Sequence, residues 1–141
     1  MKSDETLLRA FVVKIREMKN QLNNHLENIK IEVKTVGKNN IKLNAVQSLN
    51  IFRIIEEAIQ NSVKYSGGDK IIIKFNLFPE GFELTVKDNG CGFDPKKIKS
   101  GEGLHNMQFR CEEAGGIFKI NSGQRGTEIK CRFTINNTNA V

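Results

Sequence analysis

The sequence has little cysteine or histidine, no tryptophan and no long apolar run. Its three cysteines lie far apart and form no Cys-x-x-Cys pair, and only two histidines accompany them, which argues against a disulfide framework and a zinc site. No apolar stretch approaches the ~20 residues of a membrane span, and the N-terminus lacks the apolar core of a signal peptide. We therefore expect reduced thiols, a cytoplasmic location and no direct membrane contact for this domain.

Size and charge narrow the class further. The 141 residues suit one domain with a single core, and 38% apolar and 27% charged residues are typical of a soluble globular chain. The net charge is +6, but no basic stripe with interleaved aromatic residues is present, so we expect no nucleic-acid partner. A local cluster at Lys96, Lys97 and Lys99 fits a polyanionic small ligand equally well.

Periodicity and turn residues divide the chain into alternating helices and strands. Helices are predicted over residues 3–28, 45–65 and 103–114, and strands over 29–33, 70–78, 82–88, 117–121 and 127–135. A turn is predicted over 34–40, either the start of another strand or an extended lead-in at 41–43, and a frayed tail over 136–141. The first helix is either a coiled-coil seam or a helix that lies on the rest of the domain. His25 falls on its apolar seam between Asn24 and Leu26, so we expect a structural role for this histidine.

The predicted helix 45–65 carries two different faces. At 100° per residue, the apolar face collects Ile51, Ile55, Ala58, Ile59 and Ser62, with Phe52 and Val63 at its edge. The other side collects polar side chains about one turn apart, Arg53, Glu57, Asn61 and Lys64. A carboxylate, an amide and two cations in one stripe suit a magnesium–triphosphate, although such a stripe by itself is more typical of a solvated helix face.

Two polar residues continue the inward phase of strands that otherwise bury apolar side chains. Asp88 follows Val86 toward the core, where an unpaired charge is very unfavourable, and Thr127 begins the last strand on its inward side. Asp88 therefore needs an internal hydrogen-bond partner or a ligand. A carboxylate in this place accepts a hydrogen bond from an amine such as that of adenine and repels the carbonyl that guanine presents there.

Glycines follow Asp88 and recur before the next predicted helix. Gly90 and Gly92 let a flat ligand lie against the backbone. Gly101 and Gly103 place free amides at a helix start, which favours phosphate oxygens. A lone Gly-x-Gly is weak evidence, so the case depends on the ordered set of motifs.

That ordered set closely resembles the GHKL-type ATP-binding domain (HATPase_c) shared by histidine kinases, gyrase, Hsp90 and mismatch-repair ATPases. The resemblance covers about residues 29–135 and is carried by residues 57–66 (EAIQNSVKYS), 88–93 (DNGCGF), 101–107 (GEGLHNM) and 126–127 (GT). The motifs look most like those of sensor histidine kinases of the nitrate-sensor (NarL-partner) type. Their first box ends in Lys-His, where this sequence has Lys64-Tyr65, and a tyrosine can still stack on adenine.

The resemblance implies an α/β two-layer sandwich, a mixed β-sheet with helices on one face, which binds ATP and Mg²⁺. It implies that Asn61 holds Mg²⁺, that Glu57 polarises the attacking group as the catalytic residue, and that Lys64 contacts phosphates. Asp88 would bind the adenine amine and Thr127 the water network around it. The further ATP-binding positions that it implies are Tyr65, Gly90, Gly92, Phe93, Gly101, Gly103 and Leu104.

The function that follows is the catalytic domain of a two-component histidine kinase, which donates the γ-phosphate of ATP to a histidine. The sequence shows no phosphoacceptor box, so we expect that histidine on a dimerisation domain of the same longer protein, with a downstream response regulator as the next partner. Residues 1–28 would continue from that domain, 29–135 would form the ATP-binding domain and 136–141 a flexible tail. Two alternatives stay open: a stand-alone serine kinase of the anti-sigma-factor type, and a non-catalytic nucleotide-binding interaction module.

Overall fold

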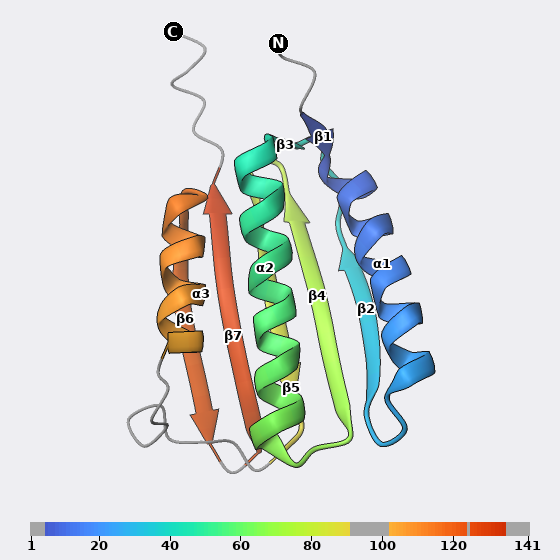
Figure 1. Ribbon diagram of the computed structural model, residues 1–141. Coiled ribbons are helices and arrows are strands. Elements are labelled where there is room, and N and C mark those ends of the chain that lie inside the picture. Colours follow the sequence, from blue (N-terminus) through green and yellow to red (C-terminus); the bar gives the residue numbers. More distant parts are fainter. Residues whose placement is uncertain (1–4, 91–101, 124, 135–141) are drawn as a thin grey trace, which may run out of the picture.

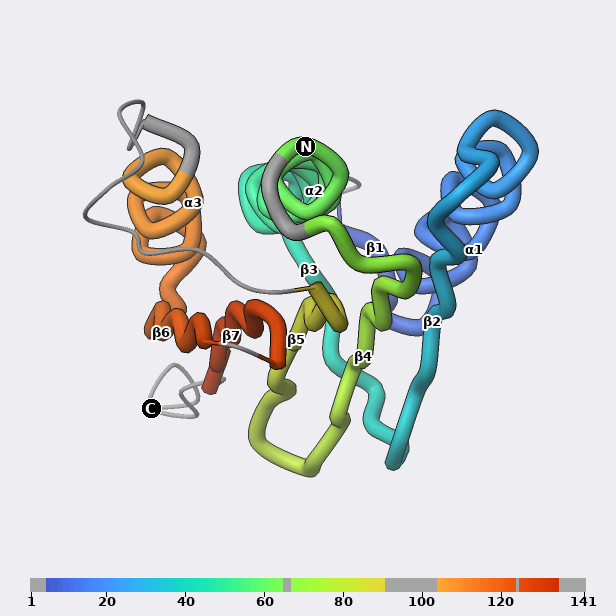
Figure 2. Tube along the Cα trace, turned by 90° about the horizontal axis from the view of Figure 1, so that it is seen from below, coloured from blue at the N-terminus to red at the C-terminus, as the bar shows by residue number. Residues whose placement is uncertain are grey.

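In the part of the chain that the structure describes, the fold is a two-layer α/β sandwich with three α-helices on one face of a five-stranded mixed sheet (Figures 1 and 2). The computed structural model describes residues 5–90, 102–123 and 125–134, and leaves the side chains at positions 65, 66, 102 and 103 undescribed. The elements are β1 (Thr6–Leu7), α1 (Leu8–His25), β2 (Lys30–Val36), β3 (Lys42–Leu43), α2 (Ala45–Asn61), the π-helical turn η1 (Ser62–Ser66), β4 (Lys70–Phe78), β5 (Gly81–Asp88), α3 (Glu102–Glu113), β6 (Gly116–Gly123) and β7 (Gly126–Thr134).

The sheet has the strand order β2-β4-β5-β7-β6. β2 runs parallel to β4, and the other neighbours are antiparallel, which makes the sheet mixed as predicted. The two short strands β1 and β3 pair separately beside the first turn of α1. No helix within the described ranges is long and apolar enough to cross a bilayer.

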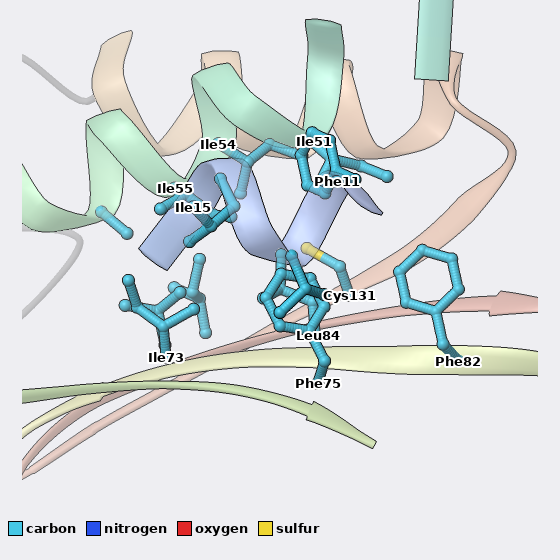
Figure 3. Close-up of a cluster of buried hydrophobic side chains, with 14 of the residues drawn as sticks. Phe11, Ile15, Ile51, Ile54, Ile55, Ile73, Phe75, Phe82, Leu84 and Cys131 are labelled. Carbon is cyan, nitrogen blue, oxygen red and sulfur yellow. The ribbon is translucent and has the colours of Figure 1, made fainter. Parts of the chain in front are cut away.

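A single core fills the space between the helices and the sheet (Figure 3). Strand alternation places one side chain in two in this core, as β4 shows most regularly. Its inward residues are Ile71, Ile73, Phe75 and Leu77. Phe11 of α1 meets Phe75 edge-to-face with ring centroids 6.3 Å apart, so α1 belongs to the same core as α2 and α3. Of the two interpretations of the first helix, the structure shows the one in which it lies on the rest of the domain.

Two buried cysteines contribute to this core as small apolar side chains. Cys111 of α3 and Cys131 of β7 are both free and fully buried. The hydrogen bond with Cys111, followed by burial, raises the pKa of the Cys131 thiol far above its ordinary value, so that thiol stays protonated and unreactive. Cys91 lies outside the described residues.

Several predicted boundaries differ from the structure. The first helix begins at Leu8 rather than residue 3 and ends at His25 rather than residue 28. His25 is exposed in its last turn, so the expectation that it lies on the apolar seam is wrong. β2 extends to Val36 into the predicted turn, because pairing with β4 continues through Val36 and Asn76 and so overrides the turn preference. For the other predicted elements, most of the predicted first and last residues lie within one or two residues of the observed ones.

Candidate nucleotide-binding site

The site is built at the C-terminal end of α2, where the helix changes its winding. Asn44 begins α2 with a reciprocal capping box with Gln47, and the regular α-helix ends at Asn61. The predicted α-helix to residue 65 is instead continued by the π-helical turn η1, and Gly67 then ends it in the left-handed conformation at φ 69°. Single π turns are common at functional sites, because they redirect side chains at the end of a regular helix.

Asp88 lies beside this turn, at the end of β5, and is 3% exposed. Its Oδ2 accepts a hydrogen bond from the Ser62 hydroxyl at 2.8 Å. Its Oδ1 accepts two more from backbone amides, those of Gly90 at 3.0 Å and Thr127 at 3.2 Å. The buried charge therefore has internal partners, which was one of the two possibilities that its inward position left open. These three bonds join η1, β5 and β7 through one carboxylate.

The carboxylate has room for one more donor, because its two oxygens offer about four acceptor positions and three are used in the described residues. Asp88 also borders a small cavity between α2, α3 and the sheet. The cavity is lined by Ala58, Asn61, Ser62, Val86, Asp88, Leu104, Met107, Thr127 and Ile129. Its volume of about 10 Å³ holds about one water molecule. A purine would therefore need this space to open.

Thr127 completes the polar part of this cavity from β7. It is 6% exposed, and its hydroxyl shares a 2.7 Å hydrogen bond with the hydroxyl of Ser122 on β6. Gly126, which precedes it, has φ 121°, and a Cβ there would lie 2.0 Å from the carbonyl oxygen of Asp88. Gly126 is thus required for β7 to approach the end of β5 closely enough for the Thr127 amide to reach Asp88.

Another polar residue, Asn89, joins the loop after η1 to the end of β5. Its Oδ1 accepts from the amides of Asp69 and Lys70, both at 3.0 Å, and its Nδ2 donates to the Asp69 carboxylate at 2.7 Å. A Cβ on Gly68 would lie 2.6 Å from the Gly90 nitrogen, so these two backbones pack directly together. We did not predict this role for Asn89, although its place between Asp88 and Gly90 was a signal that could have found it.

The structure thus brings together four of the predicted site residues, Asn61, Asp88, Leu104 and Thr127, around one cavity. Glu57 is half-buried one turn before Asn61 on α2, and Lys64 is exposed in η1. Gly90 is buried and donates to Asp88, and Gly103 lies in the first turn of α3. The predicted positions Gly92, Phe93 and Gly101 lie outside the described residues, as do Lys96, Lys97, Lys99 and the side chain of Tyr65.

The donor set fits a nucleotide better than a metal held by protein alone. Among the described residues, no three His, Cys, Asp or Glu side chains form a group that could hold a metal ion. Asn61 offers a single amide oxygen, which suits a Mg²⁺ whose other ligands are phosphate oxygens and water. The buried carboxylate of Asp88 and the side-chain amide of Asn61 line the same cavity. This arrangement is consistent with an adenine amine at Asp88 and metal-bound phosphates near Asn61.

Comparison with known proteins agrees with this geometry. Residues 46–137 match the family described as histidine kinase-, DNA gyrase B- and HSP90-like ATPase (HATPase_c). The sensor protein VraS of Staphylococcus saprophyticus is 37% identical over 89 residues, and the sensor histidine kinase MctS of Rhizobium johnstonii is 35% identical over 91 residues. Each alignment covers 62% of this chain, but only 26% of VraS and 20% of MctS. The chain therefore spans about a quarter or less of these curated relatives.

Solved structures show the same fold. The Acinetobacter baumannii histidine kinase AdeS superimposes with a TM-score of 0.72 at 15% identity, covering 97% of this chain and 70% of that one. The catalytic domain of histidine kinase ThkA gives 0.71 at 16% identity, covering 92% of this chain and 93% of that one. On the family match, the sequence relatives and the fold, this chain belongs to the HATPase_c ATPase family and is homologous to the catalytic domains of sensor histidine kinases.

Proposed function

We propose that this chain is the ATP-binding catalytic domain of a two-component sensor histidine kinase, which binds Mg-ATP and donates its γ-phosphate to a histidine. The observation that carries the proposal is the buried Asp88, which lines the same cavity as Asn61 and, among the described residues, keeps one acceptor position beyond its three hydrogen bonds. An exocyclic amine fills such a position, whereas a carbonyl is repelled. The site therefore favours adenine over guanine.

Four of the predicted site residues have the following proposed parts in this activity. Asn61 would hold Mg²⁺, which neutralises charge on the phosphates when bound. Glu57, one helical turn earlier, would orient and polarise the attacking imidazole. Lys64 would contact phosphate oxygens from the exposed side of η1, and Thr127 would bind a water beside the base. Catalysis of this kind depends mainly on positioning and charge neutralisation.

The remaining ATP contacts belong to the proposal as well: Tyr65, Gly90, Gly92, Phe93, Gly101, Gly103 and Leu104. Gly90 supports it through its backbone bond to Asp88, and Leu104 through its place in the cavity wall. The motif spacing, with Gly-x-Gly-Leu-x-x-Met and a helix that ends at Glu113 shortly before Gly115-Gly116, supports a place in the nitrate-sensor (NarL-partner) subfamily. Alignment against that subfamily and against VraS-type kinases over these motifs tests this finer assignment.

The partners follow from the relatives, which are named as a sensor histidine kinase and a sensor protein and are much longer than this chain. We propose a phosphoacceptor domain of the same longer protein, which residues 1–28 would join to the ATP-binding domain over 29–135, with 136–141 as a tail. A response regulator would then receive the phosphoryl group. These sequence relatives favour the histidine kinase over the serine kinase and over the non-catalytic module.

Calorimetry with ADP, ATP and GTP, each with and without Mg²⁺, tests the nucleotide assignment. We expect binding of adenine nucleotides, dependence of ATP affinity on Mg²⁺ and no measurable binding of GTP. Labelled ATP offered together with the protein's phosphoacceptor domain tests the transfer. An acid-labile, base-stable product indicates phosphohistidine, whereas an acid-stable product would support the serine kinase. Absence of binding by any adenine nucleotide would refute the proposal.

A further inference from the structure

The sheet face opposite the helices is strongly basic. No helix covers this face within the described part of the chain, as Figure 2 shows. Strand alternation points one side chain in two toward it, and basic residues outnumber acidic ones. The basic residues are Lys30, Lys34, Lys70, Lys74, Lys87, Lys119, Lys130 and Arg132, and the acidic ones are Glu32, Glu83 and Glu128. Most of the net positive charge of the chain therefore lies on a surface that the nucleotide site does not use.

The strand register arranges these charges in a row that crosses the whole sheet. Lys34 pairs with Lys74, Lys74 with Thr85, Thr85 with Lys130, and Lys130 with Lys119. Adjacent strands are about 4.8 Å apart, so the row is about 19 Å long. Like charges directly opposite each other destabilise a sheet, and two such pairs occur in this row. Because this row lowers the stability of the sheet, it indicates that the lysines have a role other than stabilising the fold.

Within the described residues, some of these basic side chains form ion pairs, and Lys70 approaches Glu32 at 3.4 Å. Lys130 approaches Glu83 at 4.0 Å, and Glu83 also pairs with Arg132 at 3.6 Å. Across residues 5–90, 102–123 and 125–134, Lys34, Lys74 and Lys119 form no ion pair. The charges of these three lysines are therefore exposed to a partner rather than compensated by a neighbouring carboxylate of the described chain.

The row also borders a shallow depression in the twisted sheet. This depression has a volume of about 350 Å³ and is lined by side chains of β2, β4, β5 and β7. Its walls include Lys34, Lys74, Lys87 and Lys130, with Glu83 and Glu128 among them. It differs from the nucleotide cavity in every lining residue and lies on the other side of the sheet.

We propose that this lysine row is a docking surface for an acidic polypeptide segment of a protein partner. An extended segment of about six residues spans the row, since a strand rises about 3.3 Å per residue, and its Asp and Glu side chains would meet the lysines. A planar bilayer does not follow a depression that also carries Glu83 and Glu128. Single-stranded nucleic acid uses aromatic stacking platforms, and no aromatic side chain lines this depression. A second copy of the chain would present the same positive charge and repel.

The test compares two variants that carry the same change in net charge. The row variant replaces Lys34, Lys74, Lys119 and Lys130 with Gln. The control variant replaces four lysines on other surfaces, Lys14, Lys19, Lys38 and Lys42, with Gln. The probe is a fluorescein-labelled decaglutamate peptide, whose binding is followed by fluorescence anisotropy at low ionic strength, where screening is weakest. Saturating ADP is present in one series so that the nucleotide site makes no contribution.

We expect the row variant to weaken decaglutamate binding at least about tenfold, and the control variant to change it less than about threefold, with or without ADP. The melting temperature of the row variant should equal or exceed that of the parent chain, because repulsion within the row is removed. Equal weakening in both variants, or none in either, overturns the proposal. The proposal is also overturned if the row substitutions weaken binding to vesicles containing phosphatidylserine, or to oligo-dT, more than they weaken binding to the peptide. None of these outcomes bears on nucleotide binding, which calorimetry measures separately.

Discussion

Replacing Asp88 with Asn changes the charge of the carboxylate while keeping its shape. In the Asp88→Asn protein, the remaining side-chain oxygen can still accept from the amides of Gly90 and Thr127, which now bond to Asp88 at 3.0 and 3.2 Å. The new amide group would face Ser62, and its hydroxyl can accept instead of donating. The fold should therefore survive, with every hydrogen bond converted from a charge-assisted to a neutral one.

The size of both effects follows from these contacts. A hydrogen bond to a charged group contributes about 1.5–3 kcal/mol and a neutral one about 0.5–1.5 kcal/mol, so each conversion loses about 1–1.5 kcal/mol and three lose about 3–4.5 kcal/mol. The lower desolvation cost of an uncharged side chain offsets part of that loss, and we expect a net destabilisation of about 1–2 kcal/mol. Binding suffers more, because an N–H replaces the acceptor that faces the adenine amine. A loss of about 3 kcal/mol or more corresponds to at least about a hundredfold weaker binding.

Urea unfolding and calorimetry with ADP measure the two effects on the same preparation. Glu80→Gln makes the same charge change on the exposed turn between β4 and β5, and should leave both quantities close to those of the parent chain. The ratio of ADP to GDP affinity gives a further readout. The introduced amide could donate to the carbonyl of guanine, so the preference for ADP over GDP should become smaller. Unchanged ADP affinity in a folded Asp88→Asn protein would refute the assignment of the site.

Three other substitutions or treatments test separate parts of the structure. Asn61→Ala should abolish the Mg²⁺ dependence of ATP affinity, and a metal dependence equal to that of the parent chain would contradict the proposed role. Gly81→Ala should cost about 3 kcal/mol or more in urea unfolding, because its Cβ would lie 2.0 Å from the carbonyl oxygen of Phe133; a loss below about 1 kcal/mol would show that the strands relax. Cys111 and Cys131 should resist iodoacetamide in the folded protein and react after unfolding, as mass spectrometry can measure; rapid labelling of the native protein would show that the thiols are accessible.

The parts of the fold that sequence predicted correctly are those set by strict alternation. In β7, Thr127, Ile129, Cys131 and Phe133 are all buried, as the period of two requires. The same rule placed Asp88 inside, from which its need for hydrogen bonds followed. Local periodicity fixes which side of an element is buried, because burial of one face is enforced by the whole core.

Features that depend on distant contacts were not predictable in this way. Asn50 is 3% exposed on α2, where it donates to Glu113 at 3.1 Å and accepts from Arg110 at 3.5 Å. No local pattern of α2 indicates that α3 supplies a carboxylate and a cation at that point. The same holds for the π turn at residues 62–66, because Ser62 is drawn toward Asp88 from another element. The lysine row depends on strand register, which single strands do not specify.

The size of the cavity leads to a prediction about which element moves when nucleotide binds. Small-molecule sites enclose about 300–1,000 Å³, against about 10 Å³ here. The sheet side of the cavity is fixed by strand pairing, and α2 is fixed by its cap and its core side chains. Among the described residues, the hydrogen bonds that join α3 and the following Ala114 to α2 lie at the C-terminal end of α3, at Arg110, Glu113 and Ala114.

The first turns of α3, which carry Leu104 and Met107 into the cavity, are therefore the part that we expect to yield. Hydrogen exchange with and without ADP should show the largest change in protection at residues 104–108, less at 110–114 and little in α1. The exchange of α1 serves as the internal control, because this helix packs on the far side of α2 from α3 (Figure 1). A change spread evenly over all three helices would mean that the domain tightens as a whole, and the inference from the hydrogen bonds of α3 would then be wrong.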